Sequence, residues 1–245
     1  AIVERMMKAL PHPEAQVFTP YGATECLPVS LIGSREILGE TRQRTGEGAG
    51  VCIGRPVRGI EAKVIPISDE PVPVWDDSLA LPPGQVGEIV VKGGPVTLRY
   101  YNRDRATALA KIDDTDGSVR HRMGDLGYFD YTGRLWFCGR KSQRVVTPEG
   151  VLFTDPVEGV FNTHPLVYRT ALVGVGVNGS ARPVLCVELE PGAYREDRAR
   201  ITAELQALGA QRPHTKNVTT ILFHPGFPVD IRHNSKIFRE KLAVW

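Results

Sequence analysis

The sequence predicts two domains, a β-rich domain over residues 1–141 and a compact α+β domain over residues 142–245. Three observations lead to this prediction. The chain has 245 residues, which is enough for one to two domains. Short runs of β-branched residues between Pro- and Gly-rich turns fill residues 59–140, a pattern typical of a small antiparallel barrel or sandwich. Beyond Lys141, helical and strand patterns alternate.

The first domain opens with a helical pattern, in which Val3, Met6, Met7 and Leu10 share one face and Pro11 ends the helix. A short strand is expected next over residues 15–19. The Gly-rich residues 45–54 have no periodicity, so we expect a loop there. The remaining expected elements are strands over residues 60–67, 86–92, 126–130 and 134–138, and a helix over residues 106–112 with Asn102 as its N-cap.

The second domain is expected to begin with a helix capped by Asp155, because Pro156 then takes the first helical position. Its Val157 and Phe161 have the spacing of a buried stripe. Strands are expected over residues 171–177, 184–189 and 219–223. Helices are expected over residues 193–208 and 237–245.

Composition and charge exclude several classes of protein. Lys and Arg number 30 against 28 Asp and Glu, so the net charge of +2 does not favour a general binder of nucleic acid or anionic membranes. No apolar run approaches the ~18 residues of a membrane span. The four cysteines are scattered, which argues against a zinc cluster or a disulfide framework and predicts reduced thiols in a cytoplasmic protein.

The beginning of the chain resembles the middle of a helix and lacks an initiator Met. We therefore expect a fragment from a longer protein. The alternative is a natural start after removal of Met.

Residues 21–25, Tyr-Gly-Ala-Thr-Glu, follow the first expected strand. The hydroxyl of Thr24 can donate to a phosphate oxygen, and the carboxylate of Glu25 can hold a hard Mg²⁺ ion. The alternative is a plain turn at the end of a strand.

Asp125 and Arg140 each follow a glycine, fifteen residues apart. A carboxylate at a glycine turn can accept two hydrogen bonds from a ribose diol, and an arginine suits phosphate or ribose oxygens. The alternative is a hairpin over residues 127–139 with a solvated charge at each end.

Residues 234–239, Asn-Ser-Lys-Ile-Phe-Arg, lie close to the end of the sequence. Taken alone, Lys236 is most simply explained as a solvated charge.

Taken in order, these motifs resemble one superfamily, the adenylate-forming enzymes, which include acyl-CoA synthetases, firefly luciferase and peptide-synthetase adenylation domains. The set also includes the strand Gly-Glu-Ile-Val-Val over residues 87–91 and Arg-Tyr-Tyr-Asn over residues 99–102. The resemblance implies a multidomain α/β and α+β fold. The chain would hold the end of the large N-terminal domain, with its β-barrel subdomain, and the small mobile C-terminal domain.

The resemblance also implies a role for each residue. Tyr21 and Gly22 would flank the adenine and the acyl carboxylate, Thr24 would contact phosphate, and Glu25 would ligate Mg²⁺. Asp125 would hold the ribose hydroxyls of ATP, with Arg140 supporting ribose and phosphate. Ser142 falls at the hinge position, and Lys236 matches the mobile lysine that stabilises the transition state of adenylation.

Three features depart from the superfamily pattern. The Ser/Thr/Gly-rich phosphate loop, which precedes the Tyr-Gly turn by well over a hundred residues, is absent, so we expect this chain alone to be inactive. Ser235 replaces the usual Gly before the catalytic lysine. The linker over residues 143–155 keeps only a trace of the pattern, which weakens the expectation of a CoA-binding face.

Several segments are closer to one branch, the OleC proteins or olefin β-lactone synthetases; they lie over residues 75–77, 121–127, 135–142, 161–165 and 236–242. That resemblance implies an AMP-forming ligase that activates a 2-alkyl-3-hydroxy fatty acid with ATP and Mg²⁺ and closes it to a β-lactone. It also implies possible assembly with other enzymes of olefin biosynthesis. The alternatives are a long-chain acyl-CoA ligase and, from another class, a nucleotide-binding or interaction fragment without turnover.

Overall fold

The computed structural model describes residues 2–177, 179–231 and 233–245, and the side chains of residues 233–235 also lie outside the description. The chain divides into two compact units. Unit 1 holds the chain up to Gln43 together with Val51–Lys141. Unit 2 holds Arg44–Gly50 together with Ser142–Trp245.

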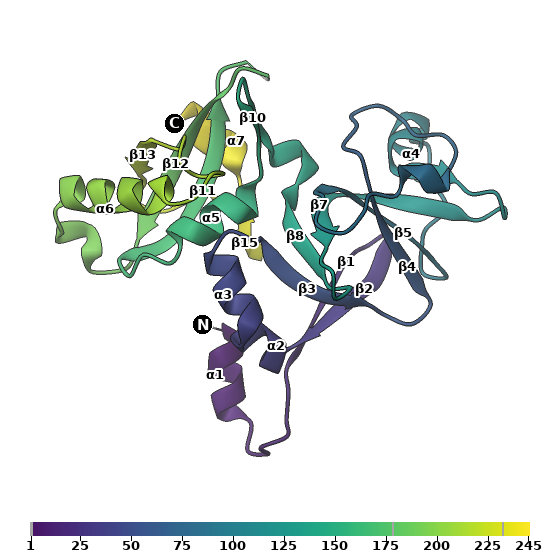
Figure 1. Cartoon of the computed structure of the whole chain (residues 1–245), viewed down its shortest axis with the longest axis horizontal. Coiled ribbons are helices and arrows are strands. Elements are labelled where there is room, and N and C mark those ends of the chain that lie inside the picture. The colour runs from purple at the N-terminus through teal and green to yellow at the C-terminus, as the bar shows by residue number, and fades with distance from the viewer. Residues whose placement is uncertain (1, 178, 232) are drawn as a thin grey trace. The chain divides into compact units, whose positions relative to one another are not determined.

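Unit 1 is built on a sheet of eight strands in the order β1-β2-β3-β8-β7-β5-β4, with β6 paired to β7 (Figure 1). These strands pair in antiparallel fashion. Their bounds are β1 Phe18–Ala23, β2 Cys26–Gly33, β3 Val51–Pro56, β4 Ile60–Ile65, β5 Gly87–Gly93, β6 Lys111–Asp113, β7 Val119–Phe129 and β8 Leu135–Arg140.

Strand β5 shows why this sheet forms. Successive side chains of a strand point to opposite faces, and both faces of β5 are buried. Ile89 and Val91 pack in one hydrophobic cluster. Val90, between them, packs in another cluster with Trp75 and Ile112. The apolar run over residues 89–91 therefore serves two cores.

Short helices precede the first strand of unit 1 or connect later ones. They are α1 Ile2–Ala9, α2 Ser34–Leu38 and α4 Asp104–Ala110, and α3 Glu40–Gly46 runs across the boundary between the units.

Unit 2 centres on the strands β11, β12 and β13, in which β11 and β12 are antiparallel and β13 is parallel to β12. Side chains of helices α5 and α6 pack on one face of this sheet, against Leu172 and Leu185. Leu242 of helix α7 packs with the opposite face, against Val173 and Cys186. The bounds are β9 Val145–Thr147, β10 Gly150–Leu152, α5 Thr154–Phe161, β11 Val167–Val175, β12 Arg182–Leu189, α6 Arg198–Ala210, β13 Thr220–Phe223, β14 Val229–Asp230, β15 His233–Ile237 and α7 Arg239–Val244.

The segment Arg44–Gly50 packs within unit 2, although strands of unit 1 precede and follow it. Gly159 of α5 approaches the carbonyl of Thr45 so closely that an added Cβ would lie 2.5 Å from that oxygen. Gly48, with a φ of +91°, leaves room for the ring of His214. Because glycine has no side chain, Gly159 allows α5 to approach the backbone at Thr45, and Gly48 allows the His214 ring to approach the 44–50 segment.

Several sequence predictions for unit 1 are wrong in detail. The strand expected over residues 15–19 is β1, Phe18–Ala23, so Tyr21 lies within the strand rather than after it. The loop expected over residues 45–54 instead holds the end of α3 and the beginning of β3. Asn102 is not a helix cap: its φ is +52°, and α4 begins at Asp104 after Arg103. The strand expected over residues 126–130 is the second half of the longer β7.

Helix starts in unit 2 also differ from the predictions. Helix α5 begins at Thr154, so Asp155 is inside the helix and is not its cap. Helix α6 begins only after Asp197, whose carboxylate accepts hydrogen bonds from the next backbone N–H groups, and a separate 3₁₀ turn occupies residues 193–195. The last helix begins at Arg239, because Ile237 still belongs to β15. Within the described ranges, no helix combines the length and apolar character needed to cross a bilayer.

Candidate functional site

The first group of predicted residues lies on the β1–β2 hairpin of unit 1. Ala23 pairs with Cys26, so Thr24 and Glu25 form the turn between the strands. A Cβ on Gly22 would lie 2.6 Å from the carbonyl oxygen of Cys26, so glycine permits this close approach. Thr24 is exposed and Glu25 is half-buried, which leaves a hydroxyl and a carboxylate at the end of the hairpin.

The carboxylate of Glu25 is held by one neighbouring side chain. The Tyr100 hydroxyl donates to Oε1 at 2.6 Å, and this hydrogen bond is the main reason why the pKa of Glu25 lies below its usual value. Burial, followed by the proximity of Glu25, raises the pKa of Tyr100 to about 12. A hydrogen bond from the backbone N–H of Glu25 to its own carboxylate also lowers this pKa, which favours the ionised form. The residue therefore fits a Mg²⁺ ion, which binds one or two protein carboxylates together with substrate phosphates.

Asp125 and Arg140 lie on the neighbouring strands β7 and β8, and Tyr21 of β1 meets Asp125 although β1 pairs with neither strand. The Tyr21 hydroxyl donates to Asp125 Oδ2 at 2.6 Å. Arg140, which is opposite Asp125 in the β7–β8 pairing, forms an ion pair with it, with Nη1 3.0 Å from Oδ1. Burial raises the pKa of Asp125 against the opposing effect of Arg140, and burial raises that of Tyr21. Because a carboxylate oxygen has more than one acceptor site, Oδ1 can accept from a hydroxyl donor in addition to its ion pair with Arg140.

The hairpin alternative describes the backbone here correctly, since β7 and β8 are the two arms of a hairpin. It describes only one of the two charges correctly. The side chain of Arg140 is 48% exposed, whereas that of Asp125 is 5% exposed. The Asp125 carboxylate is therefore not a solvated charge, and charged side chains are rarely buried to this extent unless they have partners.

The remaining predicted residues belong to unit 2, which the structure describes by itself. Lys236 lies on β15, which pairs with the two-residue strand β14, and its side chain is exposed. Ser142 lies in a 3₁₀ turn over residues 141–143 and lines a hollow of about 320 Å³ together with Arg239. The side chain of Ser235 lies outside the described residues.

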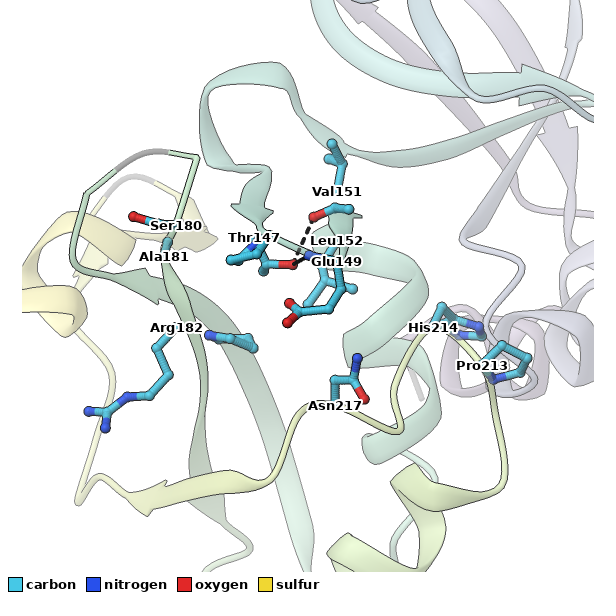
Figure 2. Close-up of a pocket in the computed structure, with 13 residues that line it drawn as sticks. Thr147, Glu149, Val151, Leu152, Ser180, Ala181, Arg182, Pro213, His214 and Asn217 are labelled. Carbon is cyan, nitrogen blue, oxygen red and sulfur yellow. Dashed lines mark hydrogen bonds between the residues drawn. The ribbon is translucent and has the colours of Figure 1, made fainter.

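A second hollow in unit 2, of about 840 Å³, is formed by segments that include the linker hairpin β9–β10 (Figure 2). Figure 2 shows Glu149, Arg182, His214 and Asn217 among the polar side chains around it. The predicted residues Ser142 and Lys236 do not line this hollow.

Sequence reasoning missed two residues next to Glu25. Tyr100 was part of a recognised motif but had no role, and Lys111 was not noticed. The side chain of Lys111 is buried, and its Nζ donates to the carbonyl and the hydroxyl of Thr97. A lone lysine between a short helix and a short strand gives no sequence signal of burial; only its pairing with His121 of β7 places it inside the sheet.

Comparisons with known proteins identify related sequences. The family model described as AMP-binding enzyme matches residues 1–101. An olefin beta-lactone synthetase of Xanthomonas campestris pv. campestris is 54% identical over 243 residues, which are 98% of this chain and 44% of the relative. Its counterpart in Stenotrophomonas maltophilia is 54% identical over 95% of this chain and 42% of the relative. A long-chain-fatty-acid–CoA ligase of Escherichia coli O6:H1 is 31% identical over 72% of this chain and 28% of the relative. The chain thus spans less than half the length of these curated relatives.

Solved structures confirm the predicted adenylate-forming fold. The amide bond synthetase McbA of Marinactinospora thermotolerans matches with a TM-score of 0.70 at 24% identity, over 93% of this chain and 42% of that chain. The o-succinylbenzoate CoA synthetase of Bacillus subtilis, in complex with its acyl-adenylate intermediate, matches with a TM-score of 0.68 at 23% identity, over 93% and 41%.

Proposed function

Since this chain belongs to the AMP-binding, adenylate-forming enzyme family, we propose that its gene product is an AMP-forming olefin β-lactone synthetase. The enzyme uses ATP and Mg²⁺ to activate a 2-alkyl-3-hydroxy fatty acid as an acyl adenylate, which then closes to a β-lactone. The observation that carries this proposal is the 54% identity, over 98% of the chain, to a protein named for that reaction. The acyl-CoA ligases reach only 31% over 72%.

In this proposal, unit 1 binds the nucleotide. Asp125 accepts the ribose hydroxyls, and its burial beside Arg140 and Tyr21 supports that role because these two residues fix the carboxylate in place. Arg140, half-exposed beside it, contacts ribose and phosphate oxygens. Tyr21 orients Asp125, and Tyr21 and Gly22 flank the adenine and the acyl carboxylate.

The turn between β1 and β2 faces the phosphates. Thr24 donates its hydroxyl to a phosphate oxygen, and Glu25 holds Mg²⁺ through Oε2. When bound, the ion neutralises charge on the phosphates during adenylation. Glu25 needs only one free oxygen for this, since the hydrogen bond from Tyr100 fixes the other.

Lys236 supplies a mobile positive charge. Negative charge develops at the α-phosphate as pyrophosphate leaves, and an ammonium placed there lowers the barrier. Its exposure leaves the side chain available to a ligand. A rotation at Ser142 would bring the lysine to the phosphate and remove it after the first step.

The second step needs no external acceptor. The oxygen of the 3-hydroxyl attacks the carbonyl carbon, a C–O bond closes the four-membered ring, the hydroxyl proton is lost, and the bond to AMP breaks with its electron pair on the phosphate. Proximity drives this closure, because the nucleophile is already on the acyl chain. The leaving phosphate must offset the ring strain.

The test supplies the full gene product with ATP, Mg²⁺ and a 2-alkyl-3-hydroxy fatty acid, with and without CoA, and measures AMP and the product mass. We expect AMP and a β-lactone without CoA. The matched acid without the 3-hydroxyl should give an acyl adenylate but no lactone. A thioester formed only with CoA would favour the long-chain ligase instead, and failure to release AMP from any acid would favour a binding module. Assembly with other olefin-biosynthesis enzymes belongs to the same proposal, and co-purification would test it.

A further inference from the structure

The backbone and side chain of Glu25 are both held by one irregular segment of unit 1, residues 94–103. The Tyr100 hydroxyl donates to Glu25 Oε1 at 2.6 Å. The Thr97 backbone N–H donates to the Glu25 carbonyl oxygen at 2.9 Å. The position of the Glu25 carboxylate therefore depends on where this segment lies.

Residues of α4 and β6 in turn hold this segment in place through hydrogen bonds. The Tyr100 backbone N–H donates to the Thr107 hydroxyl at 3.1 Å. Lys111, the first residue of β6, donates from Nζ to the carbonyl and the hydroxyl of Thr97, and Nζ lies 5.8 Å from the centroid of the Tyr100 ring. Lys111 is thus in contact with both residues that hold Glu25.

Lys111 is costly to bury for a purely structural purpose. The residue is 6% exposed, and its direct hydrogen-bond acceptors are the neutral oxygens of Thr97. A buried ammonium without a carboxylate in direct contact is unfavourable, and an apolar side chain of similar volume would fill the space at less cost. Burial lowers the pKa of Lys111, and the nearby negative charge of Glu25 opposes that effect. The lysine therefore supports the negative charge on Glu25 while it holds the 94–103 segment in place.

We propose that Lys111 is a positioning residue that, through Thr97 and Tyr100, presents the Glu25 carboxylate to the Mg²⁺ ion that accompanies ATP. This inference rests on the proposed function, in which Glu25 is the Mg²⁺ ligand. It adds two residues, Lys111 and Tyr100, that contact neither ATP nor the ion. Partners of a metal ligand that do not touch the metal commonly change metal affinity by 10–100-fold when removed.

The experiment compares Lys111→Met and Tyr100→Phe with Lys92→Met in the full gene product. Lys92 is a matched control because it is also a lysine of this sheet, but it pairs with Asp114 and Asp116. Two readouts are taken with ATP present: the Mg²⁺ concentration at half-maximal pyrophosphate exchange, and Mn²⁺ binding by electron paramagnetic resonance. The second readout does not depend on activity.

We expect Lys111→Met and Tyr100→Phe to raise the half-saturating Mg²⁺ concentration and the Kd for Mn²⁺ about tenfold. The turnover rate at saturating Mg²⁺ should change by less than about threefold, and Lys92→Met should leave both metal readouts within about twofold. A purely structural role would lower turnover at every Mg²⁺ concentration without shifting the midpoint, and that result would overturn the inference. If Lys111→Met does not fold, Tyr100→Phe decides alone, since it removes a single hydroxyl.

Glu25→Gln separates this inference from the proposed function. If Glu25→Gln shifts both metal readouts and the other two variants do not, the positioning role of Lys111 and Tyr100 is wrong and the role of Glu25 stands. If Glu25→Gln shifts neither readout, Glu25 is not the ligand, and both ideas fail.

Discussion

Replacing Arg239 with Met should remove a buried ion pair of unit 2. Nη2 of Arg239 lies 2.7 and 2.8 Å from the two carboxylate oxygens of Glu158, and the Leu172 backbone N–H donates to the same carboxylate at 2.7 Å. The two side chains are 13% and 10% exposed. Arg239, the first residue of α7, lies three residues after Lys236. Through Glu158 it is joined to α5 and to β11.

Breaking a buried pair by removing one partner usually costs about 3–5 kcal/mol of unfolding free energy. We expect a loss of about 3 kcal/mol at pH 7, the low end of that range, because Glu158 can take up a proton instead of remaining charged. Burial already raises the pKa of Glu158 to about 7, and loss of Arg239 should raise this pKa further.

The pH dependence follows from that second rise in pKa. Above pH 7, Glu158 is ionised in the folded wild type, whereas in the variant the folded state retains a proton that the unfolded state has lost. As the pH rises above 7, the unfolding free energy of the variant should therefore fall relative to wild type by up to about 1.4 kcal/mol per pH unit. This decrease stops once the pH exceeds the raised pKa of Glu158 in the folded variant.

Urea denaturation at pH 6, 7 and 8 measures this difference, and hydrogen exchange at the Leu172 amide reports locally on the Glu158 carboxylate. The control is Arg200→Met, which removes a 49% exposed arginine paired with Glu196 and Glu204 on the surface of α6. That change should cost less than about 1 kcal/mol. A loss below 1 kcal/mol for Arg239→Met, constant with pH, would refute the reasoning.

Three further predictions concern the site and the sheet. Lys236→Ala should lower acyl-adenylate formation by about 10²-fold or more, because it removes a positive charge from the transition state. The urea midpoint should stay unchanged because the side chain is exposed. Unchanged adenylation would mean that Lys236 is only a solvated charge. Asp125→Asn should raise the KM for ATP more than it lowers turnover, as measured by pyrophosphate exchange, whereas an equal loss of stability without ATP would mark a structural residue. Gly54→Ala should destabilise unit 1 by at least about 2 kcal/mol in urea, because φ is +82° and the new Cβ would overlap the Leu31 carbonyl; a neutral result would show that the β2–β3 contact can relax.

The elements predicted best from the sequence are those in which the pattern of apolar residues matches the residues that are buried. Strands β4 and β5, expected over residues 60–67 and 86–92, lie at Ile60–Ile65 and Gly87–Gly93. Strand β3 was missed because Gly54 interrupts its pattern, at a point where the pairing with β8 also shifts register. The beginning of α6 was misplaced because apolar residues before Asp197 imitate a helix, while the cap itself fixes the start.

Site residues divide in the same way. Asp125 and Glu25 could be proposed as site residues from the sequence because glycine turns and carboxylates form short local motifs, and their binding roles stay predictions. The pairing of Asp125 with Tyr21, 104 residues earlier, could not, since it depends on the strand order of the sheet. Lys111 could be found only from the structure, because a charged residue becomes buried through tertiary pairing and not through any local pattern.

The segment Arg44–Gly50 has a mechanical consequence for a rotation at Ser142. The backbone passes between the units after Gln43, after Gly50 and after Lys141, so three covalent connections join them. A body on one pivot turns freely, but bodies joined at three points form a closed linkage in which every joint must move together. If Ser142 is the hinge, as proposed above, torsion there can proceed only as far as the other two connections turn with it, or until residues 44–50 detach from α5. Stiffening that short segment should then restrict the proposed movement of Lys236 as effectively as a change at Ser142.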